Sequence, residues 1–187
     1  DDGAVDENGN CCWFFLIFNG KAGYCRTAKS WDTFKTSCCN EDIAKVQVGG
    51  TTIWSETCRQ EEIDTVVGRE ADKCVYMGSY CKKKVKILGM TIGCRDYRKT
   101  YCCFDNKLAR IIHNSSKDAG ESGEDRMRRK SEGGRGQLKA FNRNGDGNVE
   151  TIWGTAKYPD CRGFKPDEFA MIDFSKLDLS EYVSDMQ

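Results

Sequence analysis

The first strongly apolar segment of the chain runs from Cys11 to Phe18 and is followed by the dipeptide Asn19-Gly20. A short, continuous apolar and aromatic run is typical of a buried strand, and Asn-Gly is a strong signal for a hairpin turn. We therefore expect a buried strand that enters a hairpin at Asn19-Gly20. From there to about residue 73 the periodicity is weak, which predicts loops and short elements held together by disulfides.

Alternation of side chains is clearest in residues 81–87, which read CKKKVKI and precede the dipeptide Leu88-Gly89. The even positions place Lys82, Lys84 and Lys86 on one face of an extended segment, whereas Lys83, Val85 and Ile87 lie on the other. The pattern predicts a strand with a solvated basic face. A second strand, roughly 91–104, is expected to return after the turn.

This hairpin would bring cysteines into register across the two strands. If the turn is centred near residues 88 and 89, Cys81 lies near Cys94 after a small register slip. Cys74 then lies opposite either Cys102 or Cys103, and the spacing leaves these two alternatives open. Cross-strand disulfides are expected in either case.

Helical spacing of apolar residues follows the second strand. Phe104, Leu108, Ile111 and Ile112 recur at this spacing, and Asp105 is a candidate cap, so we expect an amphipathic helix that covers the hairpin. The composition then shifts to Ser, Gly, Glu, Arg and Lys, without an apolar period. This shift predicts a mobile surface loop near residues 114–136.

Order is expected to return near the end of the chain. Pro166 suits the first position of a helix, and the two acidic residues that follow it complement the helix dipole. Phe169 and Ile172 supply an apolar face for this helix. Residues 173–182 are expected to form a packed tail.

Composition changes this picture through its cysteines. The chain has twelve in 187 residues, with adjacent pairs at 11–12, 38–39 and 102–103 and no Cys-x-x-Cys. An even number without the short spacing of zinc knuckles or redox motifs indicates disulfides formed in an oxidising compartment, and this spacing argues against zinc. We predict that all twelve form disulfides: Cys11, Cys12, Cys25, Cys38, Cys39, Cys58, Cys74, Cys81, Cys94, Cys102, Cys103 and Cys161.

Charge and hydropathy narrow the class of protein further. The 29 basic and 29 acidic residues cancel, so nothing in the overall charge favours direct contact with nucleic acid or with an anionic membrane. The longest apolar run is too short for a transmembrane helix. The acidic amino terminus lacks the features of a secretory signal, so we expect a processed product or a piece of a longer precursor.

Candidate catalytic and metal-binding motifs are weak. Residues 142–148 resemble the start of a calcium loop, but Trp153 stands where the closing glutamate belongs, which favours a polar turn. The single histidine, His113, has no assigned partner and is expected to be a packing or surface residue. The basic run 126–130 is expected to be solvated, and Asn114-Ser115-Ser116 fits the glycosylation pattern. We predict no catalytic, metal-binding or cofactor-binding residue.

Several ordered motifs resemble a known family. They are CVYMGSYC at 74–81, YCCFDNKLARII at 101–112, GRGQL at 134–138, WG at 153–154, PDCRGF at 159–164 and DFSKLDLSE at 173–181. Together they resemble the carboxy-terminal region of the TraN family, the cysteine-rich mating pair stabilisation proteins of F-type conjugation systems in Gram-negative bacteria. The resemblance covers about residues 74–182. The stretch from about His113 to Gly133 is inserted relative to the family pattern, and the chain is far shorter than long members.

The resemblance implies an exported component of the donor's type IV secretion system, at the outer membrane or cell surface, that stabilises donor–recipient pairs during plasmid transfer. Its partners would be other conjugation proteins of the donor envelope and a recipient outer-membrane protein. In the family a variable tip recognises recipients, whereas the matched motifs belong to the base. We expect action by binding rather than by an enzyme activity. The alternatives are a secreted cell-wall hydrolase, with two converging carboxylates of raised pKa, and a purely structural assembly module.

The expected fold is a small α+β, disulfide-rich domain in which a β-hairpin packs against short helices and irregular loops. Residues 74–187 would form the TraN-like domain, and residues 1–73 a cysteine-containing region that can belong to the same domain. Rigidity from the disulfides would lower the entropy lost on docking. Exposed tryptophans would be candidate binding anchors, with core packing as the alternative: Trp13, Trp31, Trp54 and Trp153.

Overall fold

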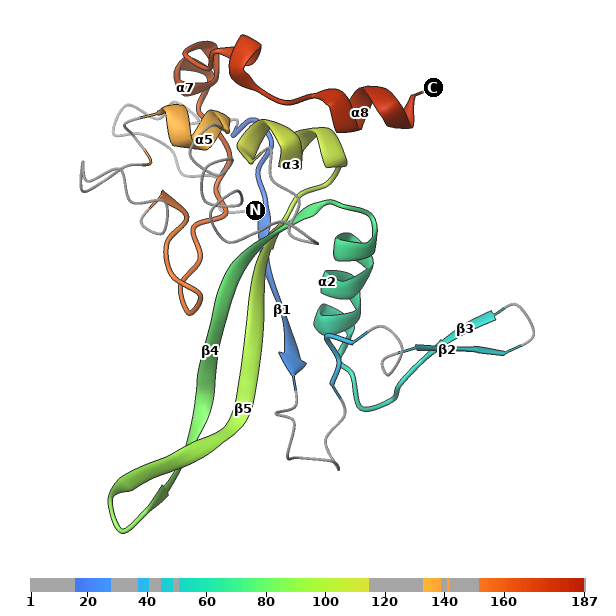
Figure 1. The fold of residues 1–187 in the computed structure, drawn as a ribbon, viewed down its shortest axis with the longest axis vertical. Helices are drawn as coiled ribbons and strands as arrows, with labels where there is room; N and C mark the ends of the chain where they lie inside the picture. The colour runs from blue at the N-terminus through green and yellow to red at the C-terminus, as the bar shows by residue number, and fades with distance from the viewer. Residues whose placement is uncertain are drawn as a thin grey trace, which may run out of the picture.

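The computed structural model describes residues 16–27, 37–40, 45–48, 51–114, 133–138, 141 and 152–186. Two antiparallel sheets and several short helices make up this part of the chain (Figure 1). The elements are β1 (Lys21–Thr27), β2 (Lys45–Val48), β3 (Thr51–Trp54), α2 (Gln60–Glu70), β4 (Cys74–Ile87), β5 (Met90–Cys103), α3 (Lys107–His113), α5 (Gly134–Gln137), α7 (Pro166–Ala170), the 3-10 turn η1 (Phe174–Lys176) and α8 (Ser180–Asp185). The protein is therefore an α+β, disulfide-rich domain, as the sequence predicts.

The long β4–β5 hairpin is the central element, and it confirms the predicted hairpin. Its first strand begins at Cys74, earlier than the segment 81–87 that shows the alternation. The register pairs Cys74 with Cys103, which resolves the alternative that spacing leaves open. The sheet has the order β1-β5-β4, so β5 lies in the middle.

The Asn19-Gly20 dipeptide predicts a hairpin, but the apolar segment before it does not pair with the strand that follows it. Ile17 instead pairs with Phe164 through a single bridge, and the chain continues into β1, which pairs with β5. Gly20 donates its backbone N–H to the carbonyl of Cys161 at 2.9 Å. Among the described residues, the segment before Asn19-Gly20 therefore pairs with Phe164, and the strand after it pairs with β5.

Helix α2 lies on β1, in a region where the sequence predicts only loops and short elements (Figure 1). Its buried face consists of Glu62, Thr65 and Val66, so two of the three buried side chains are polar. A Cβ at Gly23 would lie 2.5 Å from the Thr65 hydroxyl, so glycine lets the helix approach β1 closely. The polar face hides the apolar period by which helices are recognised.

The remaining helices gather at one end of the hairpin and cover the main core (Figure 1). Helix α3 is confirmed, but its cap is Asn106 rather than Asp105, because the Asn106 side chain accepts the Ala109 N–H at 2.8 Å. Helix α7 is confirmed and starts at Pro166. The tail of η1 and α8 packs on the core through buried Leu177 and half-buried Leu179.

The predicted mobile loop near 114–136 is wrong at its carboxy-terminal end. Residues 134–137 form α5, and Gly133, Gly134 and Arg135 are buried. A Cβ at Gly133 would lie 2.5 Å from the carbonyl oxygen of His113, so this contact between segments requires glycine. Residues 115–132 lie outside the described residues.

The main core lies between the proximal part of the hairpin and these helices. Its large buried side chains include Phe104, Ile112, Trp153 and Phe164. A second, smaller cluster lies between β1, β5 and α2 and includes Cys25, Val66 and Tyr101. Both β1 and α2 precede residue 74 and pack on the hairpin, while a domain boundary at residue 73 stays a prediction.

Candidate functional site

Within the part of the chain that the structure describes, five disulfides join segments that are separated in the sequence. They are Cys25–Cys39, Cys38–Cys58, Cys74–Cys103, Cys81–Cys94 and Cys102–Cys161. In the adjacent pairs 38–39 and 102–103, each cysteine bonds to a different segment, so three segments meet at one point. Cys11 and Cys12 lie outside the described residues, and their bonding stays a prediction.

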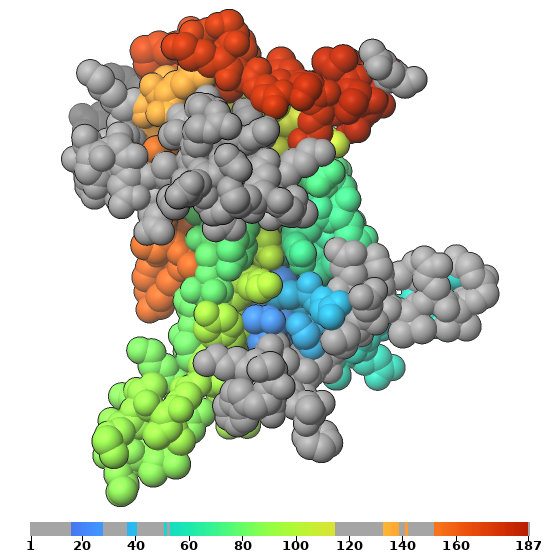
Figure 2. Space-filling model, in the orientation of Figure 1, coloured from blue at the N-terminus to red at the C-terminus, as the bar shows by residue number. Residues whose placement is uncertain are grey.

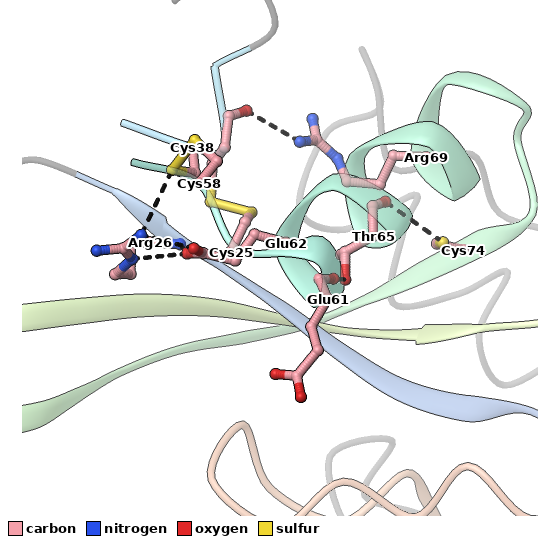
Figure 3. The surroundings of a disulfide bond; sticks show 10 residues. Cys25, Arg26, Cys38, Cys58, Glu61, Glu62, Thr65, Arg69 and Cys74 are labelled. Carbon is pink, nitrogen blue, oxygen red and sulfur yellow. Dashed lines mark hydrogen bonds and ion pairs between the residues drawn. A yellow bond between two sulfur atoms is a disulfide. The ribbon is translucent and has the colours of Figure 1, made fainter. Parts of the chain in front are cut away.

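An ion pair reinforces the two disulfides beside β1 (Figure 3). Fully buried Glu62 accepts hydrogen bonds from Arg26 Nε at 2.8 Å and Nη2 at 2.6 Å, and from the Arg59 N–H at 3.0 Å. Burial alone would raise the pKa of Glu62, but these hydrogen bonds outweigh it and hold the pKa below its usual range. Arg26 also donates to the Thr57 carbonyl at 2.6 Å, which ties α2, β1 and the Cys38–Cys58 region together.

Fully buried Arg135 connects the carboxy-terminal segments in the main core. Its guanidinium donates to the carbonyls of Ile152 at 3.2 Å, Asp160 at 2.6 Å and Arg162. The same group lies over the rings of Phe141 and Trp153, 4.3 and 4.2 Å from their centroids. One side chain therefore satisfies three backbone carbonyls and packs between two aromatic rings.

His113 is also fully buried and belongs to this arrangement. Its ring stacks between Phe104 and Phe164, with centroid distances of 4.5 and 4.1 Å. Because Nδ1 accepts from Arg135 Nε at 3.4 Å, we assign the proton to Nε2, which donates to the Phe18 carbonyl at 2.9 Å. Burial, and then the charge of Arg135, lower the pKa of His113 well below its usual value, so the ring is neutral in the folded protein.

The end of the β4–β5 hairpin that lies away from the core is exposed. We call residues 82–92 the hairpin tip; in Figure 2 the distal end of the hairpin protrudes from the rest of the described protein. Four of its aliphatic side chains are exposed, namely Ile87 by 55%, Leu88 by 94%, Met90 by 67% and Ile92 by 59%, whereas Val85 is half-buried. The site is thus a braced hairpin that presents an apolar tip.

Comparison with known proteins identifies the family. The family model described as F-type Type IV secretion system, TraN, matches residues 3–123. The chain belongs to the TraN family. It is 28% identical over 169 residues to the mating pair stabilization protein TraN of Escherichia coli (strain K12). That alignment covers 90% of this chain and 21% of the relative, so the chain spans about a fifth of the relative's length. No solved structure matches the chain.

The TraN resemblance noted in the sequence is confirmed, but the family match covers a different range from the motifs that carry it. Those motifs run from Cys74 to Glu181, whereas the family match begins at residue 3, includes β1 and α2, and ends at residue 123, before the last four motifs. This agrees with the fold, because β1 supplies an edge of the sheet and α2 lies on it. The chain is therefore a member of a family of the F-type type IV secretion system.

Two further carboxylates of this TraN domain, buried Glu168 and half-buried Glu181, are paired with cations. Glu168 accepts from Arg162 at 2.8 Å, and Glu181 lies 2.7 Å from Arg110 and 3.0 Å from Lys107. For both, desolvation opposes the paired cations, and the cations hold the pKa below its usual range. Among the described residues, every carboxylate with a shifted pKa has it lowered, whereas a hydrolase acid requires a raised pKa.

The structure also locates the residues that the sequence suggested as binding anchors, as a glycosylation site or as metal ligands. Trp153 is buried, so it is excluded as a binding anchor, and Trp54 is half-buried against the cysteine clusters. Fully buried Asn114 is inaccessible to glycosylation. Among the described residues, no group of three or more His, Cys, Asp or Glu is placed to hold a metal ion. The segments 126–130 and 142–148, with Trp13 and Trp31, lie outside the described residues.

Sequence reasoning missed the buried arginines Arg110 and Arg135. Each lies within a motif used for the family resemblance, but a charged residue is ordinarily expected at the surface. The small residues around Arg135, in the sequence Gly133-Gly134-Arg135-Gly136, are the signal that could have found it. Small neighbours allow close backbone approach around a large side chain.

Mild acid is expected to destabilise the TraN domain through His113. The unfolded chain binds a proton near pH 6.5, whereas the folded ring has a pKa well below this value and faces Arg135 and Arg162. The contribution of neutral His113 to the free energy of unfolding is therefore fully present above about pH 6.5. Below that pH the free energy of unfolding should fall by up to about 1.4 kcal/mol per pH unit. Urea unfolding at a series of pH values above 5 checks this, because the paired glutamates, whose pKa values lie below the usual 4.5, stay ionised there.

A His113→Gln variant serves as the control for this acid effect. Its stability can be lower throughout, but it should not change between about pH 7 and pH 5, since no group titrates in its place. Equal unfolding free energies for the unsubstituted protein at both ends of that range would contradict the assignment.

Proposed function

We propose that this chain is the disulfide-braced part of an exported, outer-membrane-associated protein that stabilises donor–recipient mating pairs by binding rather than catalysis. The observation that carries the proposal is membership of the TraN family, together with a relative named for mating pair stabilisation. The relative's name describes the relative itself. Its extension to this chain is our proposal, since the chain spans only 21% of that protein.

The architecture supports a mechanism based on binding. The disulfides, the Arg26–Glu62 pair and the Arg135 arrangement restrict the chain before any partner arrives. A surface held in one shape loses less conformational entropy on docking, so more of its contact energy appears as affinity. We propose that this part forms a rigid base that mounts the remainder of the protein on the secretion apparatus.

The proposed location rests on the chemistry of the cysteines. Disulfides persist in oxidising compartments such as the bacterial periplasm and the cell surface. In the described part of the chain, no helix is both long enough and apolar enough to cross a membrane. We propose envelope proteins of the donor's conjugation apparatus, and a recipient outer-membrane protein, as partners.

A mating assay tests the proposed function in the full-length protein. Deleting this segment should lower transfer in agitated liquid much more than on a filter, because shear separates unstabilised pairs while a filter holds cells together. Restoring the unsubstituted segment is the control and should restore transfer in liquid. Equal transfer with and without the segment under shear would contradict the proposal.

A capture experiment separates binding to partners from a purely structural role. The oxidised chain should retain proteins from donor or recipient outer membranes, and the chain treated with reductant should retain less. A module that contacts only its own full-length protein would capture nothing from either membrane. That result, together with unchanged mating, would reject action by binding.

A further inference from the structure

The hairpin tip combines exposed aliphatic residues with positive charge. Its sequence is KKKVKILGMTI, which contains four lysines and no acidic residue. All four lysines are exposed, and so are four of its aliphatic side chains. The nearest acidic residue on the hairpin is Asp96, which lies opposite Lys83 in the register and is itself paired with Arg98.

The apex residue itself is unusual. Leu88 has a φ of 49° and Gly89 a φ of 82°, so both turn residues adopt left-handed conformations. Glycine and asparagine favour this conformation, whereas leucine is strained in it. Leu88 is also 94% exposed, so it gains almost nothing from burial within the chain. A strained, exposed leucine at the apex indicates a role in contact with something outside the domain.

The tip is held in place although it lies far from the core. The Cys81–Cys94 disulfide joins the two strands where the tip begins. Beyond this disulfide the two strands remain paired as far as the last pair, Ile87 with Met90. The register shifts at several points between Cys81 and Lys86. Bulges of this kind bend a hairpin and redirect its end. Figure 1 shows the distal end reaching away from the helices that cover the core.

The residue types at the tip identify the kind of partner. Protein interfaces depend on Trp, Tyr and Arg and contain little Lys. The tip has neither an aromatic residue nor an arginine, and all its cations are lysines. Aliphatic side chains that enter the acyl boundary, beside lysines whose ammonium groups extend to phosphates, are typical of segments that lie in a membrane interface.

We propose that the hairpin tip docks on the surface of an anionic phospholipid bilayer. The aliphatic side chains around Leu88 enter the acyl boundary, and the lysines pair with lipid phosphates. A strand rises about 3.3 Å per residue, so Lys84 lies about 13 Å from the apex. Interfacial segments enter about 5–10 Å, which leaves Lys84 at the level of the headgroups. The proposal goes beyond the proposed function, because mating pairs can be stabilised without lipid contact.

Vesicle flotation of the full chain tests this proposal. The chain should float with phosphatidylethanolamine vesicles that contain about one third phosphatidylglycerol and should not float with phosphatidylcholine vesicles. Leu88→Asn keeps a residue suited to the left-handed turn and should weaken binding about tenfold. Lys84→Gln with Lys86→Gln should weaken it about fivefold per lysine.

Matched controls lie on exposed positions away from the tip: Met171→Gln for the apolar change and Lys157→Gln for the charge change. Both should leave flotation unchanged, and all variants should keep the wild-type melting transition. Absence of flotation with anionic vesicles, or flotation that tip variants leave intact, overturns the proposal. Capture of an acidic protein by the tip without vesicle binding also overturns it. Because these readouts use the purified chain, they are independent of the mating assay.

Discussion

Replacing Arg135 by methionine should lower the free energy of unfolding by about 3 kcal/mol, because three buried or part-buried carbonyls lose their donor. These carbonyls belong to Ile152, Asp160 and Arg162, on the segment that closes the core. Methionine is close to arginine in length and cannot donate a hydrogen bond. Denaturant unfolding under oxidising conditions measures the change, with the disulfides intact.

Two further variants sharpen the Arg135 experiment. Arg135→Lys keeps the charge but loses the planar fork, so it should recover only part of the stability. Arg95→Met removes an exposed arginine from β5 and should change stability by no more than about 0.5 kcal/mol. If Arg135→Met costs less than about 1 kcal/mol, the guanidinium does not organise these carbonyls.

Among the five described disulfides, removal of Cys102–Cys161 should lower the free energy of unfolding the most. The bond joins β5 to the carboxy-terminal segment across 59 residues of sequence. In the chain-entropy treatment a closed loop of this length contributes about 4 kcal/mol. Both cysteines are buried, so the Cys102→Ala, Cys161→Ala variant also leaves space in the core. Denaturant unfolding of this double variant, with a thiol assay to show that no other cysteine is freed, measures the loss.

The matched comparison is the Cys81→Ala, Cys94→Ala variant. That bond closes only 13 residues, near the exposed tip, and in the same treatment contributes about 3 kcal/mol. Its cysteines are half-buried, so little packing is lost with it. A cost for the hairpin variant equal to or above that of the Cys102–Cys161 variant would show that loop length and burial do not govern these bonds.

Elements with a strong local signal were predictable from the sequence. The β4–β5 hairpin follows from its alternation and from the Leu88-Gly89 turn, and the predicted proximity of Cys81 and Cys94 after a register slip is confirmed by their disulfide. Helices α3 and α7 follow from apolar spacing and from Pro166. In each case the residues that make the element carry the information themselves, within one window of sequence.

The elements that were missed depend on contacts with distant residues. The buried face of α2 is occupied by Glu62 and Thr65, and it is stable there because Arg26 on β1 pairs with Glu62. Arg135 likewise is buried because its carbonyl acceptors lie 17 to 27 residues further along the chain. A charged residue in a short stretch of sequence is ordinarily predicted to be exposed to solvent. Its burial becomes understandable only when the distant residues that pair with it are known.

The exposed tip shows the opposite relation between sequence and site. Its lysines are visible in the sequence, and the predicted strand is confirmed with all four lysines exposed. The sequence does not show that Ile87, Leu88, Met90 and Ile92 are all uncovered, because exposure depends on what the rest of the chain fails to reach. Apolar residues in a strand are ordinarily expected to be packed.

The crossed arrangement of the adjacent cysteines bears on how the thiols find their partners. Cys25 bonds to Cys39 and not to Cys38, and Cys74 to Cys103 and not to Cys102. Loop-closure entropy is almost the same for two neighbours in sequence, so random encounter cannot select between them. The selection must come from strand register and from the seating of α2, with exchange correcting early mistakes. Covalent connectivity in this protein is thus a product of folding, which the bonds afterwards preserve.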